Sequence, residues 1–562
     1  MPMMKESEAY TTMDIIESWI EKGGDLSLLP IQPLYLSLKS LPENQAAVYL
    51  ERLNAEQRQL FLDLDLWEKD GIDVKEFQYW VSAYAQSPND DIRYEFASSA
   101  DFLLFLKSKF HISTFDTDDP QYPDHDNYFL TEDNLLLIEF DEDYPDLDAL
   151  RQTIKDLYSH LGVEGAYTTL FKLISENFMT LQEEEYDLKK GRLADAGFVD
   201  YYDSLKIENC FPKIELLDNF LMKKEKIVVG VDDFSKRQIL HRSALVPFKE
   251  KLLEVNEEMS KITNQKRGEF LQFNFIRLVN GAISSRSSLK DGAVAVSRSA
   301  TRVRSLLELG LDYISKFNQL GRLKLKEDES IFDYFDFTEI YKVGHSLIQI
   351  EQKKIKKAMR ENTIEDEDGF LGNYWGEFLD NSFLEPTQLL NVETGKNDEI
   401  LQTSQLERFR SLAESFCSFT PFIRQMKVAY DQLIEQGLLQ DSYYLNYSVD
   451  QIDFEAIILS SFANHINGAY KNSEQRKMGL TLKEFIAFSE KVSNNYEGVL
   501  IERKAFDVMA NDFADKFGMS EVSGFCDYMY LILKEQIEGY NFRELDEKDF
   551  AHVGGPIIFM SH

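Results

Sequence analysis

The chain has few of the residues that mark disulfide-rich, zinc-stapled or sheet-rich proteins. Its 562 residues include three cysteines, 13 prolines, 27 glycines and eight histidines. Cys210, Cys417 and Cys526 lie far apart and form no C-x-x-C pair, which argues against a disulfide framework and a structural zinc site. So few prolines and glycines favour long helices over many short strands. The composition therefore predicts a mainly α-helical protein from a reducing compartment.

Long apolar runs are missing as well. No stretch of about 18 apolar residues is present that could span a bilayer. The N-terminal sequence MPMMKESEAYTTMD has no basic segment followed by an apolar core, as a secretory signal would. We therefore expect a cytoplasmic protein without membrane insertion.

Positive charge is scarce, and the deficit is uneven. The net charge of the whole chain is -37. Residues 1–200 carry 16 basic and 41 acidic residues, which gives a net charge of -25. Residues 201–300 carry 17 basic and 13 acidic residues, which gives +4. Phosphate binding needs clustered Lys and Arg, so we expect no nucleic-acid partner for the first segment. The middle segment could bind an anion, but an acidic part of the same chain is the favoured partner.

The first hundred residues predict a stack of short helices. The sequence there repeats a pattern in which Pro is followed by an acid or amide and then by apolar residues. Asn54 with Gln57, and Asp73 with Glu76, have the spacing of a capping box at a helix start. Helices this short are stable only when their apolar stripes pack against neighbours. The apolar positions of this stack include Leu50, Leu53, Leu60, Phe61 and Leu64.

The helical period is lost between Phe110 and Asp148. Two apolar runs, Tyr128 to Leu130 and Leu135 to Phe140, are separated by polar residues, which predicts an antiparallel β-hairpin. Helical periods return afterwards. The predicted helices are Leu147 to Leu161, Val163 to Met179, Glu183 to Leu193, Val246 to Ile262, Gly268 to Ser284, Thr301 to Phe317 and Ile331 to Met359.

These patterns predict three domains. Residues 1–110 form the acidic stack of short helices, 111–233 form an α+β segment with the hairpin and a GRLADAGF turn, and 234–562 form a large helical domain. Lys226 to Val231 is a short apolar run that suits either a strand or a linker.

The most informative stretch is LQEEEYDLKKGRLADAGFVD, Leu181 to Asp200. Arg192 and Asp195 are three residues apart and can pair on one helix face, with Glu184 and Glu185 as further partners. Gly197 followed by Phe198 is typical of a left-handed helix cap with an apolar plug. We interpret the phrase as a salt-bridged helix end; the alternative is an Arg/Asp pair that lines a polar pocket.

Three more polar residues lie on predicted apolar faces. Arg277 and Asn280 follow Phe270 and Phe273 at helical spacing, and unpaired burial would cost about 1 to 3 kcal/mol each. We expect them to meet acids from another helix as core polar groups, with a ligand-facing pair as the alternative. His345, in VGHSLI, is interpreted as a core histidine, with a general base or ligand as the alternative.

The acidic loop FDTDDPQYPDHDNYF offers oxygen ligands that suit calcium or magnesium. Two prolines and the lack of a central glycine depart from known loop patterns, so a solvated loop is the favoured interpretation and no cofactor is expected. The weak metal candidates are Asp116, Asp118, Asp119, Asp124 and Asp126.

Standard catalytic and phosphate-binding motifs are absent: the sequence has no H-E-x-x-H, G-x-S-x-G, G-x-x-x-x-G-K-[ST] or G-x-G-x-x-G. Several separated phrases do occur together, namely LDLWEKD, EEEYDLKKGRLADAGFVDYYDSL, LVNGAI, LLELGLDYI and IYKVGHSLI. Together they resemble the bacterial domain-of-unknown-function family 6178. The resemblance implies one long, mainly helical protein and transfers no catalytic residue.

The sequence thus favours a cytosolic, non-catalytic helical scaffold or regulatory adaptor that binds other proteins. The alternative is an enzyme with an unrecognised polar pocket. Its candidate residues are Arg192, Asp195, Arg277, Asn280 and His345. An enzyme should gather these five around one cleft, whereas an adaptor should scatter them. Partner, substrate and oligomeric state stay open at this point.

Overall fold

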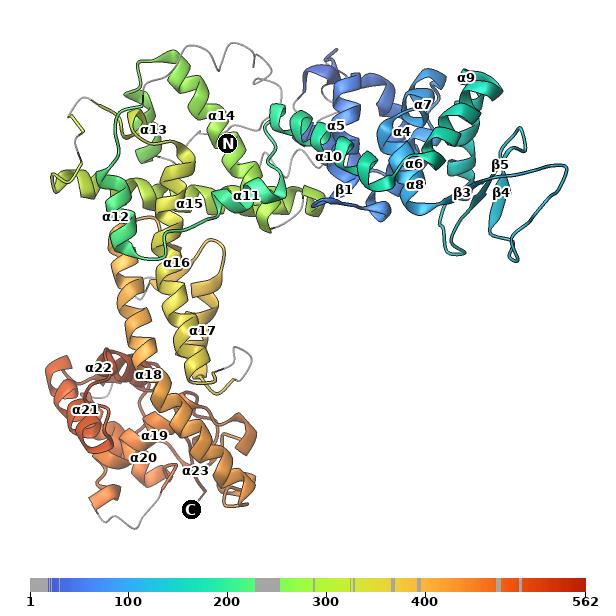
Figure 1. The fold of residues 1–562 in the computed structure, drawn as a ribbon. Coiled ribbons are helices and arrows are strands. Elements are labelled where there is room, and N and C mark those ends of the chain that lie inside the picture. Colours follow the sequence, from blue (N-terminus) through green and yellow to red (C-terminus); the bar gives the residue numbers. More distant parts are fainter. Residues whose placement is uncertain are drawn as a thin grey trace. The chain divides into compact units, whose positions relative to one another are not determined.

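The computed structural model is mainly helical, with a few small antiparallel sheets, as the sequence predicts (Figure 1). It describes residues 19, 21, 23–29, 31–227, 253–286, 289–323, 325–326, 329–364, 369–391, 396–471, 477–494 and 498–561. No helix within these ranges has the length and apolar content needed to cross a membrane.

The chain divides into two compact units. Unit 1 comprises residues 1–210 and 219–343, and unit 2 comprises residues 211–218 and 344–562. The predicted division into three domains at residues 110 and 233 stays a prediction.

Unit 1 begins with the predicted stack of short helices. Asn54 and Gln57 form a complete capping box at the start of α5, and the Asp73 side chain accepts a hydrogen bond from the backbone N–H of Glu76 at the start of α6. The apolar faces meet in an aromatic core in which Phe61 stacks on Trp80. The helices are η1 (Leu26–Leu28), α3 (Ile31–Lys39), α4 (Glu43–Tyr49), η2 (Leu50–Arg52), α5 (Ala55–Asp65), α6 (Val74–Ala85), α7 (Asp90–Ala97) and α8 (Ala100–Lys109).

The predicted hairpin is confirmed. Strands β4 (Tyr128–Leu130) and β5 (Leu136–Glu139) pair antiparallel, with Phe129 opposite Ile138. A third strand, β3 (His111–Thr114), pairs with the other edge of β5, so the strand order is β3-β5-β4. The four-residue sequence HIST is too short and too polar to predict this strand. A separate small ribbon joins β1 (Trp67–Glu68) to β2 (Gly71–Ile72).

The predicted break between Leu161 and Val163 is confirmed, because Gly162 has a non-helical backbone with a φ of +68° and divides α9 (Leu147–Ser175) into two helical segments. Two other predicted boundaries, the end of α9 and the start of the next helix, were wrong. α9 ends at Ser175 and not at Met179, because Asn177 starts α10 (Phe178–Asp195) by accepting a hydrogen bond from the N–H of Met179. The Asn cap therefore places the start of α10 five residues before the predicted Glu183.

The rest of unit 1 is built from longer helices. The predicted helix from Ile331 is interrupted, because Ser330 caps the short turn η5 (Ile331–Asp333), and Arg267 donates to the backbone oxygens of Phe332 and Phe335. The elements are α11 (Tyr201–Ile207), α12 (Ile214–Met222), α13 (Leu253–Ser260), α14 (Gln265–Arg286), η4 (Leu289–Asp291), α15 (Gly292–Gln319) and α16 (Phe337–Glu361). α12 and α16 each contain a boundary between the units. Residues 228–231 and 246–252 of the predicted elements lie outside the described ranges.

Unit 2 is a helical body around a second aromatic core. The buried ring of Trp375 contacts those of Phe416, Phe419 and Tyr528, each with centroids 5.3 or 5.4 Å away. Its main elements are α17 (Gly372–Phe383), β6 (Gln388–Asn391), β7 (Lys396–Glu399), α18 (Thr403–Glu435), α19 (Phe454–Ile466), α20 (Leu482–Val492), β8 (Ser493–Asn494), β9 (Val499–Leu500), α21 (Arg503–Phe517), α22 (Phe525–Ile537) and α23 (Glu547–Phe550).

Candidate functional site

The GRLADAGF phrase ends α10 in the predicted way. Gly197 has a φ of +87°, and the N–H of Phe198 donates to the Leu193 backbone oxygen at 2.9 Å. The Phe198 side chain is buried. The left-handed cap with an apolar plug is therefore confirmed, and it fixes the direction in which the chain leaves α10.

Arg192 forms a different ion pair from the predicted one. Its guanidinium donates through Nε to Asp63 Oδ2 (2.8 Å) and through Nη2 to Asp63 Oδ1 (2.6 Å), a two-point contact from α10 to α5. Nη2 also donates to Glu185 Oε1 at 2.5 Å. Asp195 is exposed on another part of the helix surface. The expected Arg192–Asp195 pair was therefore wrong. A planar guanidinium is stabilised more by two hydrogen bonds to the buried carboxylate of Asp63 than by an exposed acid on its own helix.

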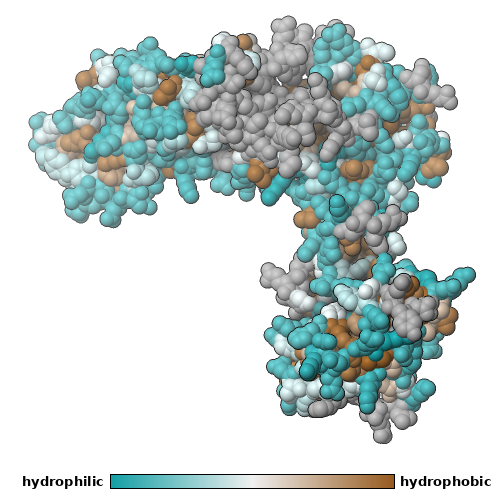
Figure 2. Space-filling view, turned by 180° about the vertical axis from the view of Figure 1, so that it is seen from behind, coloured by the Kyte–Doolittle hydropathy of each residue, from teal (hydrophilic) through white to brown (hydrophobic). Residues whose placement is uncertain are grey.

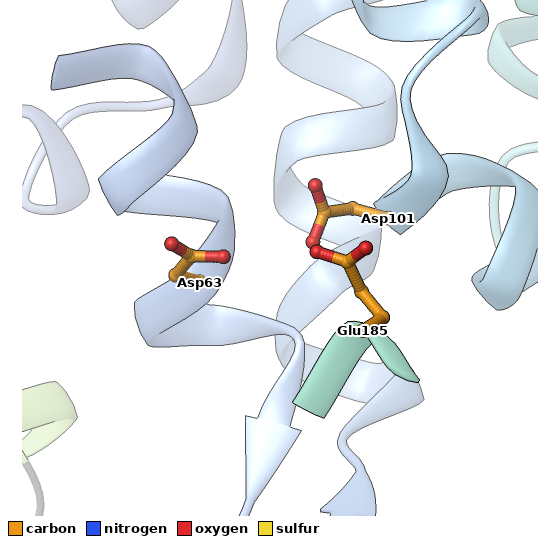
Figure 3. Close-up of side chains that lie close together, drawn as sticks. All are labelled: Asp63, Asp101 and Glu185. Atoms are coloured by element: carbon orange, nitrogen blue, oxygen red, sulfur yellow. The ribbon is translucent and has the colours of Figure 1, made fainter. Parts of the chain in front are cut away.

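A third carboxylate completes this network (Figure 3). Asp63 on α5, Asp101 on α8 and Glu185 on α10 are all buried, and one oxygen of each lies within 4.8 Å of the others. Gln59 donates to Asp101 Oδ2 at 2.7 Å and to Asp63 Oδ1 at 3.3 Å. Three carboxyl groups and one guanidinium therefore join three helices of unit 1.

Burial changes the acidity of this carboxylate network. The pKa of Asp101 is raised to about 7, first by burial and then by the negative charge of Asp63, while the hydrogen bond from Gln59 opposes the rise. The pKa of Asp63 is also raised by burial, although Arg192 opposes this change. Asp101 thus tends to hold a proton near neutral pH, so that its carboxyl group faces its neighbours uncharged.

The carboxylate network has the oxygen donors that a hard divalent cation prefers. However, Arg192 already contacts both oxygens of Asp63 and one of Glu185. A metal ion would have to displace this guanidinium. The arrangement therefore fits a cross-link between helices better than a metal centre.

A buried lysine lies beside the carboxylate network. Lys189 Nζ is 3.8 Å from Asp200 Oδ1 and lies over the rings of Tyr186 and Trp67. Tyr186 donates to the same Asp200 oxygen at 2.7 Å. Burial lowers the pKa of Lys189, and the charge of Asp200 opposes this. The burial of Lys189 was not predicted from the sequence, because two adjacent lysines usually suggest a solvated face.

Asn280 meets the same region from α14. Its Nδ2 donates to the backbone oxygen of Gly197 at 2.9 Å, and its Oδ1 accepts from Gln32 Nε2 at 3.3 Å. The Asn280 side chain is therefore hydrogen-bonded in the core, as predicted. Its partners are a backbone carbonyl and the amide of Gln32, and not the acids that we expected. Arg277 Nε is buried without a hydrogen-bond partner among the described residues, and its guanidinium lies 5.9 Å from the Phe273 ring centroid.

A cavity of about 710 Å³ opens beside these groups in unit 1. Asp63, Lys189, Asp200 and Asn280 belong to its wall. Of the five residues predicted to form a polar pocket, Asn280 lines this cavity, whereas Arg192, Asp195 and Arg277 are not part of the wall. His345 is buried in unit 2.

The predicted metal candidates lie in the loop between β3 and β4. Asp116, Asp118, Asp119, Asp124 and Asp126 are all exposed, and Asp116 accepts a hydrogen bond from the N–H of Asp118. Within the described ranges, grouped carboxylates with metal-ligand spacing occur at Asp63, Asp101 and Glu185, and not in this loop. Metal binding by the loop stays a prediction.

Replacing Gly197 by alanine is expected to destabilise unit 1 by about 1 to 2 kcal/mol, because a side chain disfavours the left-handed backbone. Gly191 supplies a matched control on the same helix, since it is exposed and an added Cβ would meet nothing within 4 Å. Gly191→Ala should stabilise α10 by about 0.5 to 1 kcal/mol. Thermal unfolding of both full-length variants checks the opposite signs; equal effects would contradict the cap.

Comparison with known proteins gives a family but no function. A family model described as "Family of unknown function (DUF6178)" matches residues 26–516. No curated protein and no solved structure matches the chain. Because the matched segment covers most of the sequence, including both units and the GRLADAGF phrase, the chain belongs to this family of unknown function, DUF6178.

Proposed function

We propose that the chain is a non-catalytic helical scaffold or regulatory adaptor that binds other proteins. The observation that carries this proposal is the pairing of Arg192 with Asp63 and Glu185. Its guanidinium links two helices, and its carboxylate partners are buried. A group engaged in this way supports the fold and is not free to act on a substrate.

The surface offers a face that suits a protein partner. Beyond the Gly162 kink, Val163, Tyr167 and Phe171 are spaced four residues apart, so they share one side of α9. Val163 is 56% exposed and Phe171 is 43% exposed, and the rings of Tyr167 and Phe171 stack at 5.6 Å. We call these three residues the α9 face. Apolar residues at this spacing are the usual anchors when a helix packs against a partner protein.

The space-filling view (Figure 2) shows how apolar residues are distributed over one side of the surface. The side drawn in Figure 2 is mainly hydrophilic, with hydrophobic residues in small separate groups and a larger group on unit 2.

An enzyme is the alternative, and it has weaker support. Its pocket was to contain Arg192, Asp195, Arg277, Asn280 and His345, but Arg192 is engaged with buried carboxylates and Asp195 is exposed. The 710 Å³ cavity, with Lys189 in its wall, is the feature that an enzyme of this family would use.

The proposal predicts that charge on the α9 face removes protein partners. Full-length wild type, the variant Phe171→Glu, and the control Val508→Glu would be cross-linked in the cell that makes the protein, and the attached proteins quantified. Val508 is 70% exposed on α21, so its variant matches the change in charge on another surface. We expect at least a tenfold loss of specific partners for the α9 variant and none for the control. Equal recovery from all three chains would contradict the α9 face as a docking site.

A further inference from the structure

Unit 2 contains a cavity of about 930 Å³ whose lining differs from that of the first cavity. Helices α17, α18 and α22 and strand β6 contribute most of its wall. The volume falls in the range of pockets that hold small organic molecules. Its apolar wall residues include Tyr374, Phe378, Leu389, Leu412, Leu531 and Ile532.

A glycine inside α17 enlarges this cavity. Gly376 lies in the interior of the helix and lines the cavity, and an added Cβ would meet nothing within 4 Å. Glycine inside a helix is less stable than alanine, because its backbone loses more freedom on folding. No close packing explains its presence here, so the missing side chain leaves room for something other than the protein.

The cavity is also rich in carboxylates. Asp453 and Glu535 belong to the wall, and neither has a cationic partner among the described residues. Arg408 is the one basic side chain among the described lining residues, and it donates weakly to the Leu390 backbone oxygen at 3.5 Å. The wall thus presents excess negative charge beside an apolar surface.

A deeper carboxylate lies directly behind this wall. Glu455 is 2% exposed, and it packs so closely on Gly372, a lining residue, that a Cβ there would come within 2.5 Å of Glu455 Oε2. Oε2 accepts from the N–H of Tyr374 at 3.3 Å, while Oε1 has no hydrogen-bond partner in the described part of the chain. A nearly fully buried, partly unsatisfied carboxyl group is costly unless a positive group neutralises it or it takes up a proton.

These carboxyl groups are weak acids, and a cation bound beside them would make them stronger acids. Burial raises the pKa of Asp453 to about 6, and hydrogen bonds from backbone N–H groups oppose the rise. Burial, followed by the charge of Asp453, raises the pKa of Glu455 to about 8. Glu535 adds further negative charge near Glu455.

We propose that this cavity binds a small organic cation, an alkyl- or arylammonium, with its charge against Asp453 and Glu535. Its apolar body packs against Phe378, Leu531 and Ile532, and the space beside Gly376 accommodates its bulk. The apolar wall selects for a hydrocarbon portion, since each methylene that leaves water for the cavity favours binding. The carboxylates exclude anions and leave a neutral analogue without its ionic contact.

The first test compares three probes of equal length that differ in charge: hexylamine, hexanol and hexanoate. Their binding to the full-length protein would be measured by isothermal titration calorimetry at pH 8. We expect saturable binding of hexylamine, at least tenfold weaker binding of hexanol and no binding of hexanoate. Equal affinities for hexylamine and hexanol would overturn the ionic contact. Benzylamine, titrated in the same way, represents the arylammonium class, and the absence of saturable binding by both amines would overturn the site.

Two variants locate the binding in this cavity. Gly376→Leu fills the open space with a better helix former, so it should fold normally and bind hexylamine at least tenfold more weakly. Asp453→Asn keeps a side chain that caps α19 well, and it should weaken hexylamine binding at least tenfold. Glu521→Gln, on an exposed acid of the same unit, controls for the change in net charge. Wild-type affinity in a folded Gly376→Leu protein would overturn the proposal.

Discussion

Replacing Arg192 by alanine is expected to lower the free energy of unfolding of unit 1 by about 3 to 5 kcal/mol, because it leaves buried carboxylates without their cation. Asp63 has a fully buried side chain and loses both contacts to the guanidinium. The remaining acids can respond by taking up a proton, so the loss should be smaller at pH 5 than at pH 8.

Hydrogen exchange and thermal unfolding of the full-length variant would measure this effect. Peptides from α5 and α10 should lose protection, while peptides from α21 in unit 2 serve as an internal reference. Lys190→Ala is the matched control on α10, since its pair with Asp203 is partly exposed and exposed pairs contribute about 0 to 1 kcal/mol. A fully stable Arg192→Ala protein that fails to complement a deletion strain would favour the enzyme over the scaffold.

Replacing Asp101 by asparagine is expected to stabilise unit 1 at pH 8 and to leave it nearly unchanged at pH 4. The folded-state pKa of Asp101 is about 7, whereas an unfolded aspartate has a pKa of about 3.9. The folded state therefore favours the protonated acid, and stability from this group falls as the pH rises from about 4 to 7. A difference of about three pKa units corresponds to an effect on the order of 2 to 4 kcal/mol above pH 7.

The asparagine variant removes this titration but keeps the shape of the side chain. Its amide oxygen can still accept from Gln59, and its NH₂ group can donate toward Glu185. Urea unfolding of both full-length proteins between pH 4 and 8 gives the comparison. Asp187→Asn, on an exposed acid of α10, serves as the control. Parallel pH profiles for wild type and Asp101→Asn would show that Asp101 does not hold a proton in the folded chain.

The sequence predicted those features of the fold that depend on neighbouring residues. The capping box of Asn54 and Gln57, the hairpin around β4 and β5, and the left-handed cap at Gly197 each lie within a few residues of chain. Their physical causes are local hydrogen bonds and backbone preferences, so the order of residues is enough to reveal them.

The candidate site was only partly predictable, because its partners are distant in sequence. Arg192 was singled out correctly as an ionic centre, but its partner Asp63 lies 129 residues away. Asn280 meets Gly197 across 83 residues. A weak signal for burial was present, since Asp63 and Asp65 interrupt the apolar run LFLDLDLW, but spacing alone could not say which cation would neutralise them.

The division of the chain between two units has a consequence for its synthesis. Residues 211–218 belong to unit 2, but the remainder of that unit begins at residue 344, after the 125 residues 219–343 of unit 1. The N–H of Phe211 donates to Ser346 Oγ, and Leu217 is fully buried in the finished protein. At about 5 to 20 residues per second, ribosomes need roughly 6 to 25 seconds to make the intervening segment. During that interval the nascent segment around Leu217 has no partners from unit 2, so unit 2 can be completed only late in translation.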